Sequence, residues 1–261
     1  MDLGLTGKRA LVLGASRGLG AAIARTLAEE GVRVTAAARS ADKIQSWTRQ
    51  LPPAVAARIT PAFVDLADMD SIDRLADGVI ANGGVTILVN NSGGPPPGPA
   101  EGAAAASWAQ QFAAMAASLF HLTNRLLPGM REQGWGRIVT IGSSGMEQPI
   151  PNLALSNGVR GAVRGWSKTL ATELAPTGIT VNVVLPGRIQ TERVEQIDRA
   201  NAERQGCTVE ETAAAARKTI PMGRYGTPQE FADTVAFLVS ERASYITGAS
   251  IRVDGGLIQG L

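Results

Sequence analysis

The 261-residue chain contains very few of the side chains that form metal centres and disulfides. It has one cysteine, Cys207, and one histidine, His121. A single thiol cannot form an internal disulfide, and a Cys/His zinc site needs several such ligands, so the composition excludes both within this chain. We therefore expect a metal-free protein of a reducing compartment, the cytoplasm.

Long apolar runs and an excess of one charge are also missing. The beginning, MDLGLTGKRALVLGASRG, has no small-residue cleavage site, and no later stretch approaches the roughly 18 apolar residues of a membrane span. Lysine and arginine number 25 and aspartate and glutamate 23, so the formal net charge is only +2. We therefore expect a soluble, unprocessed chain with neither a membrane nor a nucleic-acid partner.

Seven short apolar and β-branched runs alternate with longer segments of helical periodicity. Such an alternation is typical of a parallel sheet covered by helices on both faces. No linker or shift in composition divides the chain. The sequence predicts a single α/β domain over residues 1–261, a doubly wound Rossmann fold of about seven strands. The expected strands are 9–14, 33–38, 59–65, 85–91, 136–142, 179–186 and 249–256.

A glycine-rich turn, GASRGLG, follows the first expected strand and precedes a helix. Its G-x-x-x-G-x-G spacing differs from the G-x-G-x-x-G fingerprint, but glycines still permit a tight turn and close approach of the backbone. The helix N-terminus offers free N–H groups to a pyrophosphate. We expect the dinucleotide to contact Gly14, Ser16, Arg17, Gly18, Leu19 and Gly20.

The end of the second expected strand, AARS at 37–40, lacks the acidic residue that many NAD-binding proteins use for the ribose hydroxyls. Arg39 and Arg17 could instead neutralise a 2′-phosphate, which favours NADP(H) over NAD(H). The alternative is that both arginines are ordinary surface residues.

Five ordered motifs resemble the short-chain dehydrogenase/reductase family, and the similarity runs over nearly the whole chain. They are the glycine turn, FVDL ending at Leu66, LVNNSGG at 88–94, LPGRIQT at 185–191 and the segment 224–256. The 3-oxoacyl-acyl-carrier-protein reductase branch is the most similar. The resemblance implies that Asp65 and Leu66 flank the adenine. It also implies that Asn91, Ser92 and Gly93 line the cofactor cleft and that Pro186, Ile189 and Thr191 contact the nicotinamide side.

The same resemblance locates the asparagine, serine, tyrosine and lysine on which the chemistry of this family normally depends. Ser143 falls on the family serine, while Ser156, Arg160 and Met115 replace the tyrosine, the lysine and the asparagine. Serine is a far weaker acid than tyrosine, whose pKa is about 10. Arginine can still bind ribose or an anionic substrate, and methionine adds only packing to a proton relay.

Other side chains could take over the role of proton donor. Glu147 follows Ser143 in a loop, and we expect an exposed surface glutamate there. His121 is expected in the core or at an interface, and Tyr225 and Tyr245 are expected to be structural. Water held by Ser143 and Ser156 is the remaining proton source.

Three functions stay open on the sequence. The favoured one is an NADPH-dependent carbonyl reductase of the 3-oxoacyl type, acting on a small carbonyl, alcohol or acyl thioester. The second is an NADP(H)-binding protein without turnover. The third is a non-redox enzyme comparable to the halohydrin dehalogenases on this scaffold, against which the retained glycine turn and the absent tyrosine argue.

Two further expectations concern the substrate cover and the assembly. The charged segment 188–222 has helical periodicity and follows a strand, so we expect one or two mobile helices that cover the substrate. In the family, the active-site helices and the C-terminal strand bury surface against neighbouring copies. The resemblance and the apolar end GLIQGL therefore imply a homotetramer, with a dimer as the alternative.

Overall fold

A computed structural model describes residues 2–260 and contains one parallel sheet of seven strands in the order β3-β2-β1-β4-β5-β6-β7. Every strand lies where an apolar run predicts one, and the fold class, a doubly wound Rossmann domain, is confirmed. Most strands end one to three residues earlier than expected, because their last residues turn into the loops that follow. The strands are β1 (Arg9–Leu13), β2 (Arg33–Ala38), β3 (Ile59–Phe63), β4 (Ile87–Asn90), β5 (Gly136–Ile141), β6 (Ile179–Pro186) and β7 (Ser250–Val253).

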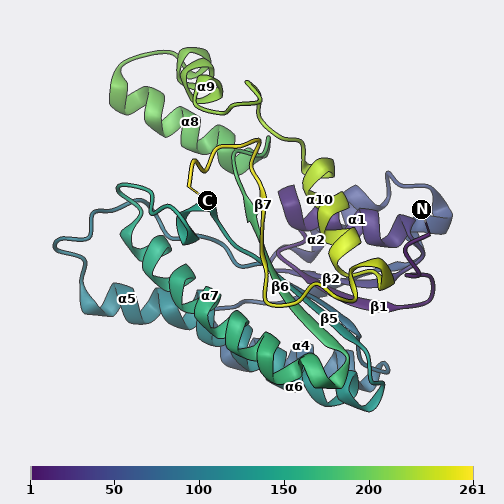
Figure 1. The fold of residues 1–261 in the computed structure, drawn as a ribbon. Helices are drawn as coiled ribbons and strands as arrows, with labels where there is room; N and C mark the ends of the chain where they lie inside the picture. Colours follow the sequence, from purple (N-terminus) through teal and green to yellow (C-terminus); the bar gives the residue numbers. More distant parts are fainter. Residues whose placement is uncertain (1, 261) are drawn as a thin grey trace.

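Helices cover both faces of the sheet (Figure 1). One layer contains α1 (Gly18–Glu29), α2 (Ala41–Thr48), α3 (Pro53–Ala56) and α10 (Pro228–Leu238). The other contains α4 (Met69–Ala81), α5 (Ala105–Phe112), α6 (Ser118–Glu132) and α7 (Ala154–Leu174). Every helix described between residues 2 and 260 is too short or too polar to cross a membrane.

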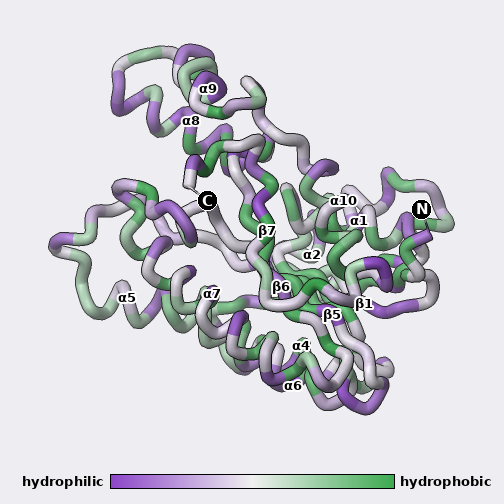
Figure 2. The backbone as a smooth tube through the Cα atoms, viewed as in Figure 1, coloured by the Kyte–Doolittle hydropathy of each residue, from purple (hydrophilic) through white to green (hydrophobic). Residues whose placement is uncertain are grey.

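The strands are buried on both faces, which explains their nearly continuous apolar sequences. In β1, Val12 packs in the core beneath α1 and α10, while Leu11 and Leu13 pack in the core beneath α4 and α6. Figure 2 shows hydrophobic residues concentrated in the central strands. Burial of both faces stabilises the sheet and leaves its carboxyl edge as the place for polar chemistry.

The chain reverses its direction of winding between β1 and β4, which are neighbours in the sheet. The loop after β1 runs to α1 on one face, and the loop after β4 runs to α5 on the other. In open α/β sheets the crevice at such a switch point is where ligands bind. Among the expected cofactor residues, 14–20 follow β1 and 91–93 follow β4, the two strands that border it.

The segment 188–222 forms two helices, α8 (Glu192–Gln205) and α9 (Val209–Lys218), which pack on each other beyond the carboxyl edge (Figure 1). The carboxylate of Asp198, only 3% exposed, anchors α8. It accepts hydrogen bonds from Arg188 Nη1 at 2.7 Å and from the Tyr225 hydroxyl at 2.8 Å. The structural role expected for Tyr225 is thus confirmed, while the mobility of this segment stays a prediction.

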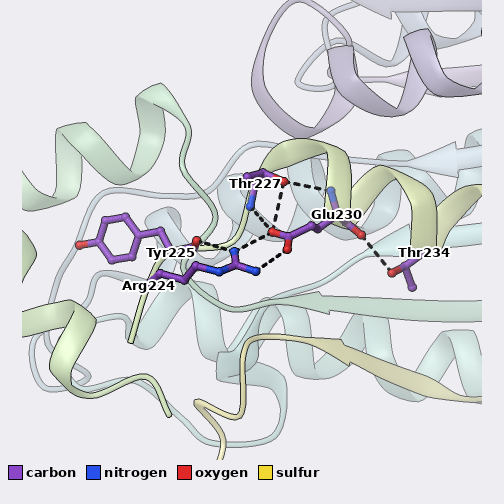
Figure 3. A network of polar contacts seen from close by, with 5 residues as sticks. All are labelled: Arg224, Tyr225, Thr227, Glu230 and Thr234. Carbon is purple, nitrogen blue, oxygen red and sulfur yellow. Dashed lines mark hydrogen bonds and ion pairs between the residues drawn. The ribbon is translucent and has the colours of Figure 1, made fainter. Parts of the chain in front are cut away.

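The start of α10 is held by a polar network around Glu230 (Figure 3). The Glu230 carboxylate accepts hydrogen bonds from the Thr227 backbone N–H at 2.7 Å and from both Arg224 Nη atoms at 2.9 and 2.6 Å. Thr227 Oγ1 in turn accepts from the Glu230 N–H, which completes a capping box. These contacts, with Arg224 the main cause, lower the pKa of Glu230 to about 2.

Candidate active site

The turn between β1 and α1 can be made only by glycines at its key positions. Gly14 and Gly18 adopt left-handed backbone angles, with φ of +63° and +56°. A Cβ atom on Gly20 would lie 2.3 Å from the carbonyl oxygen of Gly14. The glycines therefore let the backbone turn tightly and expose the first N–H groups of α1, as a bound pyrophosphate requires.

Hydrogen bonds from three other segments brace this turn. The Ala15 N–H donates to Ala37 O of β2 at 3.2 Å, and Trp47 Nε1 of α2 donates to Ala15 O at 3.1 Å. Asn91, which follows β4, donates from Nδ2 to Leu13 O at 3.2 Å. The structure thus brings Asn91 against the glycine turn, on the other side of the switch point.

The two arginines expected at a 2′-phosphate both lie near the ends of neighbouring strands. Arg39 is exposed directly after β2, and no acidic residue occurs at positions 37–40. Arg17 is also exposed, but its guanidinium pairs with the Glu192 carboxylate at the start of α8. No local sequence pattern predicts this pair, because its members are 175 positions apart.

Asp65 and Leu66 lie just beyond β3, at the same edge of the sheet as Arg39. The Asp65 carboxylate accepts from the Ala67 N–H at 3.0 Å, and the Asp65 N–H donates to Ser71 Oγ at 3.0 Å. Leu66 is half-buried against the core. The side chain of Asp65 therefore supports its own loop, and its position suits the edge of an adenine pocket.

Arg160 bridges the ends of β4 and β5. Its Nη1 lies 3.2 Å from Ile141 O and 3.3 Å from Gly142 O, and its Nη2 lies 3.5 Å from Gly93 O. Burial, and then the positive charge of Arg193 on α8, lower the pKa of Arg160 to about 10. The guanidinium therefore stays protonated at neutral pH, and it faces the loop of Asn91, Ser92 and Gly93.

Two hydroxyl groups share this region. Ser143 caps a short 3-10 turn, η2 (Ser144–Met146), and its Oγ accepts from the Gly145 N–H at 3.2 Å. Ser156 lies in the first turn of α7, which packs on η2. Both serines are half-buried, and within residues 2–260 the Ser156 hydroxyl has no hydrogen-bond partner. The Ser143 hydrogen and the Ser156 hydroxyl are thus free to bind water or substrate.

Met115 lies in the middle of η1 (Ala113–Ala117), a π-helical turn between α5 and α6. Its side chain is 4% exposed and packs in a small apolar cluster with Val159, Val163 and Leu185. A π-turn is often a feature of functional sites, but here it carries no polar side chain at its centre. The Met115 side chain therefore offers no hydrogen-bonding group that a proton relay could use.

The residues expected on the nicotinamide side lie at the end of β6 and in the loop that follows it. Pro186 is the last residue of β6, and the buried Ile189 lies between backbone hydrogen bonds that join 188–190 to Gly226. Thr191 precedes α8, and its Cγ2 would lie 3.6 Å from a Cβ placed on Gly18. The loop after β6 therefore reaches back to the glycine turn. The residues predicted to contact the nicotinamide and those predicted to contact the pyrophosphate thus border one crevice.

Glu147, another candidate proton donor, is not exposed as the sequence predicts. Its side chain is only 13% exposed, and its carboxylate pairs with Arg164 at 3.1 Å and with Arg252 of β7. The expectation of an exposed surface glutamate is wrong, because these cations come from α7 and β7, far along the sequence. Both carboxylate oxygens of Glu147 are therefore engaged by these arginines.

His121 and Tyr245 lie elsewhere. His121 of α6 contacts Asp73 of α4 at 2.8 Å, and this contact and the nearby Arg125 lower the pKa of Asp73. Tyr245 is fully exposed on the loop after α10. Among the described residues, Ser143, Ser156 and Arg160 thus remain the polar candidates after β5 and on α7.

Known proteins resemble this chain over its full length. A family model described as enoyl-(acyl carrier protein) reductase matches residues 14–258. The 3-oxoacyl-acyl-carrier-protein reductase of Vibrio cholerae is 34% identical over 258 residues, covering 98% of this chain and 99% of the relative. L-sorbose reductase from Gluconobacter frateurii, complexed with NADPH and L-sorbose, has a TM-score of 0.94 at 32% identity, covering 100% of both chains.

A variant of actinorhodin polyketide ketoreductase with NADPH gives a TM-score of 0.89 at 33% identity, covering 96% of this chain and 97% of that one. These similarities extend over at least 96% of both chains in each comparison. This chain belongs to the short-chain dehydrogenase/reductase family of NAD(P)-dependent oxidoreductases.

Proposed function

We propose that this protein is an NADP(H)-dependent carbonyl oxidoreductase of the 3-oxoacyl type that works without the family tyrosine. The observation that carries the proposal is the crevice at the switch point. There the braced glycine turn, Asn91, Arg160 and Ser143 come from four separate elements and face one another. The ketoacyl and sorbose reductases among its relatives support a carbonyl substrate.

The residues present fit NADP(H) better than NAD(H). Gly14, Gly18 and Gly20 leave room for a pyrophosphate on the N-terminus of α1. Arg39 is exposed beside that turn, without a carboxylate to repel a 2′-phosphate. Arg17 is held by Glu192, so a phosphate would compete with that carboxylate for its guanidinium. When bound, the nicotinamide supplies or accepts the hydride.

Ser143 and Arg160 provide binding and orientation of the substrate. Because Ser143 Oγ already accepts from the Gly145 N–H, its own hydrogen can be donated to a carbonyl oxygen. Arg160 has five N–H donors and uses some of them on the carbonyls of Ile141, Gly142 and Gly93. The remaining donors can bind ribose hydroxyls or an anionic group of the substrate.

Ser156 and a water molecule would supply the proton that the substrate oxygen needs. A water molecule held between Ser143 and Ser156 would donate a proton to the substrate oxygen and recover one from bulk solvent. Because neither hydroxyl is a tuned acid, we expect rates about 10²–10⁴-fold below those of relatives that keep the tyrosine.

A second function is favoured by the burial of Met115 and the unpartnered hydroxyl of Ser156. These features fit a protein that binds NADP(H) without turnover. For both functions we propose a cytoplasmic homotetramer, with a dimer as the alternative, in which α8 and α9 close over the substrate.

The decisive experiment measures NADPH binding and turnover on one sample. We expect saturable NADPH binding and slow oxidation of NADPH with 3-oxoacyl thioesters or small ketones. Ser143→Ala should lose most turnover and keep NADPH binding. Tight binding with no turnover across the panel would support the second function, and absence of NADPH binding would contradict both.

A further inference from the structure

A separate cavity of about 570 Å³ lies between α4 and the outer strands, on the face of the sheet that α4 covers only in part. Arg9 and Arg33, the first residues of β1 and β2, line one end of it, and Phe63, the last residue of β3, lines the other. Four residues of β1, roughly 15 Å of extended strand, separate Arg9 from the glycine turn. The arginine end of the cavity is therefore distinct from the site described above.

Arginines line this cavity and no acidic residue does. Arg9 and Arg33 are register partners on the parallel strands β1 and β2, so their side chains leave the same face next to each other. Like charges in such positions repel. Arg9 donates to Gly83 O, and Arg33 is exposed and forms no ion pair with any residue between 2 and 260. Arg58 and Arg74 complete the positive lining.

Two carboxylates of α4 do not neutralise this surface. Asp73 and Asp77 point across to α6, where both pair with Arg125. The side of α4 that faces the cavity carries Arg74 and Gly78, followed by Asn82, spaced one helical turn apart. Arg74 pairs with Asp68, the N-cap of α4, at 3.4 Å, so the positive charge left without a carboxylate is that of Arg9, Arg33 and Arg58 among the described residues.

The remaining lining suits a small organic molecule. Ala62, Leu75, Val79 and Val85 supply apolar contact surface, while Thr35 and Thr60, partners on β2 and β3, offer hydroxyls. The volume lies within the range typical of small-molecule sites, about 300–1,000 Å³. Phosphate oxygens are the acceptors that paired guanidinium groups bind best.

We propose that this arginine-lined cavity binds a small phosphate-bearing metabolite, with its phosphate between Arg9 and Arg33 and its uncharged part along Thr35 and Thr60. The proposal is independent of the reaction at the crevice. It assigns the molecule a second ligand site, at the opposite edge of the sheet.

The test measures binding of inorganic pyrophosphate by calorimetry to the full-length protein and to variants. Arg33→Gln removes an exposed side chain without a partner, so the fold should be kept, and we expect about a tenfold loss of affinity. Arg33→Lys keeps the positive charge but lacks the paired N–H donors of the guanidinium group, and it should lose less affinity than Arg33→Gln. Arg131→Gln removes an exposed arginine of α6, away from the cavity, and should bind as the wild type does.

Saturating NADPH separates this site from the cofactor crevice, because it occupies the glycine turn, and pyrophosphate binding should be retained in its presence. Loss of pyrophosphate binding in the presence of NADPH, with no change in Arg33→Gln, would place the anion in the crevice and overturn the proposal. Absence of saturable binding to the wild type would also overturn it. Tighter binding of ADP than of pyrophosphate in the presence of NADPH would indicate a nucleotide, and equal binding a simpler phosphate.

Discussion

At the scale of single residues, Arg160 does more than fill the position of the family lysine. Its guanidinium joins carbonyl groups from the ends of β4 and β5, a span that a lysine ammonium group cannot bridge in the same way. The arginine therefore holds together the two loops that carry Asn91 and Ser143. Arg160 thus has this structural role beside the binding role that we propose for it.

Replacing Arg160 by methionine should separate these loops. The variant leaves the part-buried carbonyl oxygens of Ile141 and Gly142 and the exposed one of Gly93 without this donor. We expect the free energy of unfolding to fall by about 1–3 kcal/mol, as measured by urea denaturation. The matched change Arg164→Met, on the same helix but outside the crevice, should leave NADPH binding intact, whereas Arg160→Met should weaken it. Unchanged NADPH affinity in Arg160→Met would contradict the proposed position of the cofactor.

Restoring the family residues should increase turnover. The triple variant Met115→Asn, Ser156→Tyr, Arg160→Lys replaces a water-mediated proton donor by a tunable phenol, and we expect a gain of about 10²–10⁴-fold in the rate of NADPH oxidation. The double variant without the tyrosine is the control and should show no gain. An equal rate in the triple variant and the wild type would show that the missing tyrosine does not limit catalysis.

We predict that a preference for the phosphorylated cofactor depends on Arg39. Arg39→Ala should raise the KM for NADPH about ten- to a hundredfold and change that for NADH little, because only the former carries a 2′-phosphate. Arg49→Ala, an exposed arginine at the end of α2, serves as the control. Equal losses for the two cofactors in Arg39→Ala would mean that this arginine does not contact the phosphate.

At the scale of elements, the start of α10 depends on an ionised Glu230. The folded-state pKa is lowered to about 2 from an ordinary value of 4.5, so the folded state binds the proton less well than the unfolded state. The stabilising contribution is therefore fully present above pH 4.5 and is lost as pH falls toward 2. We expect the Tm of Glu230→Gln to depend less on pH in this window than that of the wild type. The exposed Glu203 of α8 provides the control, and a Glu203→Gln slope equal to that of Glu230→Gln would refute the assignment.

The sequence predicts the helices and strands of this fold better than it predicts the contacts between them. Apolar runs predict all seven strands, because a strand that is buried on both faces has a nearly continuous apolar sequence. The pairs Arg17–Glu192 and Glu147–Arg252 join residues more than 100 positions apart, and no local pattern encodes them. The π-turn at Met115 was missed for a related reason, since its bulge depends on how α5 and α6 pack against α7.

At the scale of the whole molecule, α5, α6 and α7 expose an aromatic surface that one copy alone leaves in water. Phe120 of α6 stacks on Trp166 of α7 with ring centroids 4.3 Å apart, and Phe112 of α5 meets Phe120 edge-on at 6.3 Å. Phe112 is 42% exposed. A surface of this kind on the helices behind the crevice is where we expect a second copy to pack.

Light scattering after size exclusion should therefore give the mass of a tetramer for the wild type and a smaller assembly for Phe112→Glu, which introduces an unpaired charge into the expected contact. Ile80→Glu, an exposed apolar residue of α4 outside this surface, should keep the tetramer. Because Phe112 precedes the π-turn of Met115, separation of the copies should also loosen the wall of the crevice and weaken NADPH binding. A monomeric wild type, or a Phe112→Glu variant of unchanged mass, would exclude this surface as the interface.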